Sequence, residues 1–162
     1  MAQEYVKYEV VITAIIVRDG KYLITHRSAK KKRFGLMWTV PGGHLQPSDY
    51  EGLPKDTKHY WYNVLEQVLK REIKEEVGLE IDHIQYVTSL ANVHVDGAPS
   101  LVISCVADYK SGEVRLQEDE TDEHAWVTLE EAKTYDLIDG IYDELAMADA
   151  KRRGVTTEWQ RA

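Results

Sequence analysis

The feature that most constrains the fold is an apolar pattern that predicts one long helix over residues 58–77. Apolar side chains recur there at positions 61, 64, 65, 68, 69 and 73, which is the spacing of one helix face. The end of the segment carries three acids, Glu72, Glu75 and Glu76. At spacings of i, i+3 and i+4 their carboxylates share a helix face and repel one another, and Glu72 and Glu76 continue the stripe that should face the core.

These acids have two interpretations. Any single one is most simply an exposed helix-end acid, with Arg71 paired to Glu75 and Gly78 capping the last turn. The group needs more, because acids in line with a buried stripe cost free energy unless they are paired or bind a metal, and one arginine cannot neutralise three. An oxygen-rich cluster of this kind suits Mg2+ or Mn2+, which bind together with substrate phosphates. We therefore expect a divalent-cation site.

Length and composition favour one domain. The 162 residues, 43% of them hydrophobic, are enough for a proper core, so we expect a single domain over 1–162 with its core at about 8–153 and a loose tail at 154–162. Neither a signal peptide nor a run of about 18 apolar residues is indicated, so we expect a cytoplasmic protein outside the membrane. The net charge of −8 argues against broad nucleic-acid binding. Cys105, in an apolar run, is expected to be buried.

The order of the other elements predicts a mixed sheet. We expect a hairpin of 8–17 and 22–26 around Asp19-Gly20, strands at 36–40, 81–90, 101–109 and 125–127, and a closing helix at 139–153. Residues 46–58 and the acidic run 117–123 have loop composition, Asp56 or Thr57 could cap the long helix, and Thr128 begins a cap. Several strands follow one another through short turns, which favours an α+β fold over a doubly wound parallel sheet.

The helix end belongs to a longer pattern that resembles the Nudix box, G-x5-E-x7-R-E-U-x-E-E-x-G-U, where U is aliphatic. Residues 71–79, REIKEEVGL, match every specified position of its second half, and Gly43 matches its first glycine. Residues 38–43 and 123–127 also look like the segments that flank this box in the family. The resemblance therefore spans most of residues 8–150.

The front half of the box departs from the family pattern. Asp49 stands where the family has its first glutamate. Residues 50–70 separate it from Arg71, where the family has seven residues, so about 14 residues are inserted around 50–63. At the strict spacing before Arg71 stands Asn63, which is not an acid.

The resemblance implies a Nudix-like α/β/α sandwich around a mixed β-sheet and hydrolysis of a diphosphate linkage in a nucleoside diphosphate joined to another group. Bound Mg2+ ions would bridge phosphate oxygens and lower the pKa of an attacking water. By this resemblance Glu72, Glu75 and Glu76 are metal ligands, Arg71 orients a glutamate, and Gly43 makes a backbone contact near the metal. By the same resemblance the general base would be either a glutamate of the helix or an acid of the later run before Trp126, where Glu118, Glu120 and Glu123 are candidates and Glu120 is favoured.

Further substrate contacts are candidates only. Gly42 and Gly43 either form a tight turn, which is favoured, or let the backbone approach a ligand. Arg27 and His26, at a strand end, could reach phosphate, although a surface role is simpler. The basic run 27–33 is interpreted as a solvated loop rather than a phosphate clamp.

Three aromatic residues have competing interpretations. Tyr60, Trp61 and Tyr62 could stack on a base. Trp61 also fits the apolar stripe of the long helix, so core packing or a homodimer contact is as compatible with the sequence.

Together these features predict a pyrophosphohydrolase that uses Mg2+, or Mn2+, on a small-molecule substrate such as a nucleoside triphosphate, a nucleotide sugar or ADP-ribose. The alternative is a non-catalytic nucleotide-binding or regulatory module, which the altered front half of the box would suit. A third hypothesis, RNA-end processing through the basic run, is disfavoured by the net charge.

Overall fold

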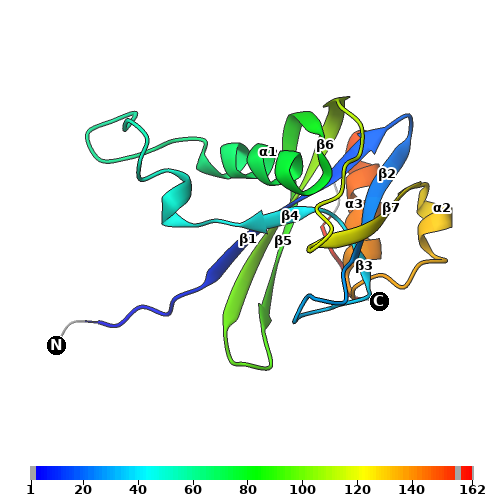
Figure 1. The fold of residues 1–162 in the computed structure, drawn as a ribbon, viewed down its shortest axis with the longest axis horizontal. Coiled ribbons are helices and arrows are strands. Elements are labelled where there is room, and N and C mark those ends of the chain that lie inside the picture. Colours follow the sequence, from blue (N-terminus) through cyan, green and yellow to red (C-terminus); the bar gives the residue numbers. More distant parts are fainter. Residues whose placement is uncertain (1–2, 156–157, 162) are drawn as a thin grey trace.

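The computed structural model describes residues 3–155 and 158–161 and contains a seven-stranded mixed sheet with helices on both faces (Figure 1). The strands are β1 (Glu9–Arg18), β2 (Lys21–Arg27), β3 (Trp38–Thr39), β4 (Gly42–His44), β5 (Glu80–Val93), β6 (Pro99–Ser111) and β7 (Thr121–Val127). The helices are the 3-10 turn η1 (Pro47–Asp49) and the α-helices α1 (Val64–Val77), α2 (Leu129–Ala132) and α3 (Ile141–Arg152).

Pairing of the strands confirms the α+β prediction. The main order is β3-β2-β1-β6-β5, with β4 paired to β1 and β7 paired to β2. Among the ladders between named strands, only β1–β6 is parallel, with Val11 opposite Val102 and Thr13 opposite Ser104; an isolated parallel bridge also joins Trp38 to Leu137. The β1–β2 hairpin turns at Asp19 and Gly20, which both have positive φ, as this tight turn requires.

The helices α1 and α3 cover opposite faces of the sheet because side chains alternate along β1 (Figure 1). Ile12, Ala14 and Ile16 pack with the buried face of α1, and Ile15 and Val17 pack with α3. Cys105 is buried in the α1-side core, as expected, and burial raises the pKa of its thiol to about 11.

The prediction for the start of the long helix is wrong. Helix α1 begins at Val64, and Asn63 before it adopts a left-handed conformation that asparagine tolerates. Residues 58–62 instead close a loop: Tyr62 N donates to Asp56 Oδ2 at 2.8 Å, and Trp61 Nε1 donates to the Leu53 carbonyl at 2.9 Å. These loop hydrogen bonds compete with helical ones, so Trp61 lies outside the core-facing stripe.

Three shorter predictions also need correction. Gly42 and Gly43 do not form a turn; they lie in β4, opposite Thr13 and Ile12 of β1. The acidic run 117–123 is a loop only at its start, because β7 begins at Thr121 and extends the pairing with β2. The strand expected at 36–40 is reduced to Trp38 and Thr39.

At the C-terminal end, Thr128 and Glu131 form the capping box of α2, and α3 closes the fold as predicted. The predicted loose tail, 154–162, lies partly outside the described residues; within its described part Trp159 Nε1 donates to Asp143 at 3.0 Å. In the part of the chain that the structure describes, no helix combines the length and apolarity needed to cross a membrane.

Candidate active site

Arg71 holds three acids together at the outer side of α1. Its guanidinium contacts Asp49 at 2.6 Å, Glu72 at 2.9 Å and Glu75 at 2.9 Å. Asp49 reaches it from η1, and its side chain is only 9% exposed. The insertion around residues 50–63, here called the insertion loop, therefore leaves the altered front acid beside the helix half of the box.

The two consecutive glycines of β4 allow the sheet to approach α1 closely. A Cβ atom on Gly43 would lie 2.2 Å from Cδ of Glu72, and one on Gly42 would lie 2.3 Å from the Ile12 carbonyl oxygen. A Cβ on Gly42 would collide with backbone, so glycine is required there, whereas a Cβ on Gly43 would force the Glu72 side chain to move. Close approach, rather than a turn, is the reason for this pair.

The carboxylate of Glu76 lies between strands β4 and β7 of the sheet. Its Oε2 accepts from Gly42 N at 3.1 Å and its Oε1 accepts from Thr121 Oγ1 at 2.9 Å. Burial raises the pKa of this carboxyl above its usual value, and these two hydrogen bonds only partly offset that effect. Burial likewise raises the pKa of Glu72.

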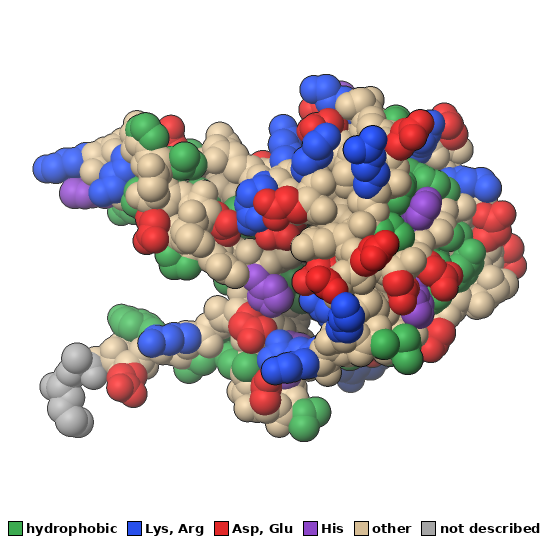
Figure 2. Space-filling model, viewed as in Figure 1, with side chains coloured by type: hydrophobic (Ala, Val, Ile, Leu, Met, Phe, Trp, Pro, Cys, Tyr) green, Lys and Arg blue, Asp and Glu red, His purple; other side chains and the backbone are tan. Residues whose placement is uncertain are grey.

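A cleft of about 750 Å3 runs from these acids along the α3 side of the sheet, and we call it the active-site cleft. It contains Glu72, Glu75, Glu76, Glu120, Gly42 and Gly43 together with three basic residues, Arg27, Lys31 and Arg33. Figure 2 shows acidic and basic side chains gathered beside the hollow between the insertion loop and the β5–β6 hairpin. A second hollow of about 810 Å3, near Gly78 and Gly112, shares only Glu75 and Gln117 with this cleft.

The basic run 27–33 is not simply a solvated loop. Arg27 and Lys31 are half-buried in the cleft wall, with Lys31 paired to Glu120. Arg33 pairs with Glu9 at 2.8 Å and with Asp96 at 2.7 Å, which ties the run to β1 and to the β5–β6 turn. Only Lys30 and Lys32 of this run's cations are exposed. Arg27, Lys31 and Arg33, here called the cationic wall, thus line the same cleft as the acids.

Of the three acids offered as general base, Glu120 lines the cleft, whereas Glu118 and Glu123 are not among its lining residues. The position of Glu120 follows from the packing of residues 113–120 on the end of α1. Arg115 N donates to the Val77 carbonyl at 2.9 Å and Gln117 N donates to the Glu76 carbonyl at 3.0 Å. These bonds bring Glu120 near Glu76, and the negative charge of Glu120 helps to raise the pKa of Glu76.

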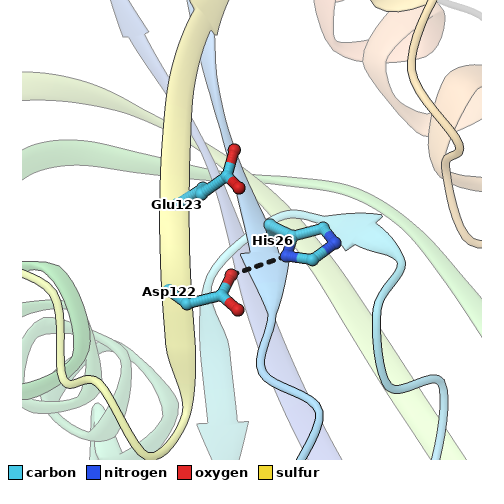
Figure 3. Close-up of side chains that lie close together, drawn as sticks. All are labelled: His26, Asp122 and Glu123. Atoms are coloured by element: carbon cyan, nitrogen blue, oxygen red, sulfur yellow. Dashed lines mark hydrogen bonds and ion pairs between the residues drawn. The ribbon is translucent and has the colours of Figure 1, made fainter.

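His26, proposed as a phosphate contact, is engaged elsewhere. Its Nδ1 lies 2.5 Å from Asp122, and its ring packs on Trp38 with centroids 5.2 Å apart. Glu123 lies opposite His26 in the β2–β7 pairing, and the bulge that follows inserts Asp122 beside it; Figure 3 shows the three side chains close together. Their ligand atoms lie within 4.8 Å of one another, but none of the three residues lines the active-site cleft.

The aromatic residues of the insertion loop also lie away from the cleft lining. Trp61 packs on Tyr50, with ring centroids 5.2 Å apart, and Lys55 sits over its ring at 5.1 Å. Tyr60 and Tyr62 are exposed. These contacts favour a self-closing loop over a base-stacking platform or the buried stripe.

The cleft has the residue types that suit a hard divalent cation, although among the described residues only His26, Asp122 and Glu123 bring three ligand atoms within 4.8 Å of one another. It offers carboxylate oxygens from Glu72, Glu75, Glu76 and Glu120, which are ligands that Mg2+ and Mn2+ prefer. The carboxylate of Glu76 is also poorly solvated, so a bound cation would stabilise its charge. In this structure Arg71 occupies oxygens of Glu72 and Glu75, so those two would exchange part of that contact for a metal.

Comparisons with known proteins agree with this geometry. A NUDIX domain model matches residues 7–145. The chain belongs to the Nudix family. The Nudix box is therefore the segment that runs from Gly43 to Leu79, with the insertion loop inside it. A MutT NUDIX hydrolase from Burkholderia pseudomallei has the same fold, with a TM-score of 0.70 at 23% identity over 87% of this chain and 98% of that one.

Two Nudix relatives have named activities. The chain is 30% identical over 132 residues to "NAD-capped RNA hydrolase NudC" of Mannheimia succiniciproducens, and this covers 78% of the chain but only 43% of that protein. It is 27% identical over 139 residues to "Nucleoside triphosphatase NudI" of Klebsiella pneumoniae, covering 78% of the chain and 86% of that protein. The family and these relatives support an enzyme of the pyrophosphohydrolase class.

Sequence reasoning missed two kinds of site residue. Thr121 and Glu144 carry no motif, and only their burial in the fold marks them. Lys31 and Arg33 were visible only as part of a basic run. Arg33 forms ion pairs with Glu9 and Asp96. These acids are far from Arg33 in the sequence, so no local pattern could predict the pairs.

Proposed function

We propose that this protein hydrolyses a diphosphate linkage in a nucleoside triphosphate, or in another nucleoside diphosphate joined to a further group, with Mg2+ or Mn2+ as cofactor. The observation that carries the proposal is one cleft lined both by carboxylates of α1 and by Arg27, Lys31 and Arg33. Carboxylates suit the cation and the basic side chains suit phosphate oxygens. The reaction adds water across the P–O–P bridge and gives two phosphate-ended products.

The charged residues nearest the end of α1 then have chemical roles. We assign Glu72, Glu75 and Glu76 to cation binding, and Arg71 to orienting Glu72 and Glu75. A cation bound there would stabilise phosphate charge and make water more acidic. We assign Glu120 the role of general base, which accepts a proton from that water, while Lys31 beside it contacts phosphate. Gly43 admits the backbone close to Glu72, consistent with its predicted contact near the metal.

A small nucleotide is favoured over capped RNA as substrate. The resemblance to NudI extends over most of that protein, whereas the chain spans less than half of NudC. The net charge of −8 also opposes extended contact with an RNA backbone. Homodimer formation, cytoplasmic location and organisation as a single domain remain proposals made from the sequence.

The deciding experiment is a hydrolysis screen with nucleoside triphosphates, NAD, ADP-ribose, nucleotide sugars and capped RNA, with and without Mg2+, and with products identified by chromatography. Loss of a residue that only supports a metal ligand typically costs about 10–100-fold in activity. Glu76→Gln, which alters a ligand itself, should lower kcat/KM by more than this. Glu66→Gln is the matched control, because Glu66 is exposed on the same helix and does not line the cleft. Nucleotide binding without turnover would support the alternative binding module.

A further inference from the structure

Glu144 lines the active-site cleft but has no part in the chemistry assigned above. Glu144, in the first turn of α3, is 4% exposed, and no lysine or arginine among the described residues forms an ion pair with it. Other acids of this helix are engaged: Asp149 binds Tyr22 and Arg153, and Asp143 accepts from Trp159. A buried carboxyl without a cation costs free energy, so its retention calls for a reason.

Glu144 is surrounded by a few polar groups and by apolar side chains. Binding sites for flat aromatic rings have the same combination. Glu144 lines the cleft with Thr13, whose buried hydroxyl has no hydrogen-bond partner. Next to Thr13 in the sheet is the buried Ser104, whose hydroxyl also has no hydrogen-bond partner. Burial raises the pKa of Glu144. Val40 and Ile141 supply apolar wall. The cleft volume is within the range of about 300–1,000 Å3 seen for small-molecule sites.

This polar end belongs to the same cleft as the catalytic acids. A nucleotide with its phosphates at Glu72, Glu76 and the basic wall would extend its remaining part along that cleft. The part of a nucleotide that needs apolar walls and a few placed polar groups is the base. The geometry therefore pairs one end of the cleft with phosphate chemistry and the other with base recognition.

We propose that Glu144 recognises the base of the substrate and selects bases that carry an exocyclic amino group over uracil and thymine; this rests on the proposed function, in that a nucleotide must occupy the cleft. An amino group donates a hydrogen bond to a carboxyl oxygen. Uracil and thymine present a carbonyl oxygen at the corresponding place, and two oxygens cannot share a hydrogen bond when the carboxyl is ionised. A buried, hydrogen-bonding site discriminates strongly because the wrong base leaves its polar group unpaired.

Cytosine and uracil test this most directly, since they differ in size very little. Affinity for CMP and UMP is measured by calorimetry at pH 8, which favours the ionised carboxyl of Glu144, and monophosphates are used because they have no diphosphate linkage to be cleaved. The wild type should bind CMP about tenfold or more tightly than UMP, the scale of one good base contact. In Glu144→Gln the ratio should fall toward one, because an amide offers a donor to the uracil carbonyl as well as an acceptor.

Two further variants complete the experiment. Glu144→Met keeps the length of the side chain without its polar atoms and should also lose the preference. Asp143→Asn removes the neighbouring exposed acid and should keep it. Circular dichroism establishes that each variant is folded.

The outcomes separate the two proposals. Equal affinity of the wild type for CMP and UMP, or an unchanged preference in folded Glu144→Gln, overturns the role of Glu144 even if hydrolysis is found. A preference that depends on Glu144 in a protein that hydrolyses no nucleotide supports base recognition and overturns the proposed hydrolysis.

Discussion

At the scale of single residues, the site depends on the absence of two side chains as much as on the presence of acids. Gly42 and Gly43 let β4 lie against β1 and against Glu72 with no room for a methyl group. The hydrogen bond from Gly42 N to Glu76 is available only because the strand comes so close. The glycines thus set the position of the carboxylates that the chemistry needs.

Gly43→Ala should therefore impair catalysis strongly. The new methyl group would meet the Glu72 carboxyl, and displacement of a catalytic group by about 1 Å can cost about a hundredfold in rate. The measurement is kcat/KM with the best substrate of the screen, together with the melting temperature. Gly52→Ala is the control, since a Cβ there meets nothing within 4 Å. Full activity in Gly43→Ala would show that Glu72 can move without consequence.

At the scale of elements, the unusual feature is a motif whose two halves come from separate segments. Asp49 in η1 and Arg71 in α1 are joined across the insertion loop by a contact of 2.6 Å. The loop closes on itself through Trp61 and Tyr50 and does not enter the cleft lining. Its ends are thereby held where the two halves of the box can meet.

A double-mutant cycle measures this connection. Asp49→Ala and Arg71→Ala should be coupled by about 0.5–1 kcal/mol in urea unfolding, a modest value because the arginine is 40% exposed. The pair Asp49→Ala and Lys74→Ala is the comparison, since Lys74 pairs with Glu80 instead. Additive effects of Asp49 and Arg71 would mean that the contact contributes nothing to stability.

The elements also show how far sequence reasoning reaches. The glutamates of α1 were predictable because helix geometry fixes the relation of i, i+3 and i+4 whatever surrounds it. The start of α1 was not, because Trp61 and Tyr62 have hydrogen-bond partners in the insertion loop that no periodicity reveals. The cationic wall was missed for a similar reason: Arg33 is placed by Glu9 and Asp96, which are distant in sequence.

At the scale of the whole molecule, the buried acids of the cleft lower the stability of the fold, although the proposed binding sites need them. Burial raises the pKa values of Glu72, Glu76 and Glu144, so the folded protein holds their protons more tightly than the unfolded chain does. Between the unfolded pKa and the higher folded one, these groups lower the free energy of unfolding as pH rises. Their destabilising effect begins near pH 4.5, the usual glutamate value, and is complete above the raised pKa.

Glu76→Gln should accordingly be more stable than the wild type at pH 8, with a smaller difference at pH 5. The amide keeps the size of the side chain and removes the cost of a buried charge. Urea unfolding at both pH values, without divalent cations, measures the difference. Acids with lowered pKa values, such as Glu9 and Asp149, lose their stabilising effect only at lower pH. Their contribution is the same in both proteins and cancels in the comparison with the wild type. An equal shift at both pH values, or the same behaviour in Glu66→Gln, would contradict this explanation.

The insertion loop has a practical consequence. Its tip near Gly52 is exposed and free of close neighbours, while its two ends are fixed by contacts of their own. Exposed loop tips of this kind accept added sequence well. A fluorescent reporter or affinity tag spliced in at Gly52 would be carried outside the working part of the molecule, which makes this loop the natural attachment point for following the enzyme in solution or on a surface.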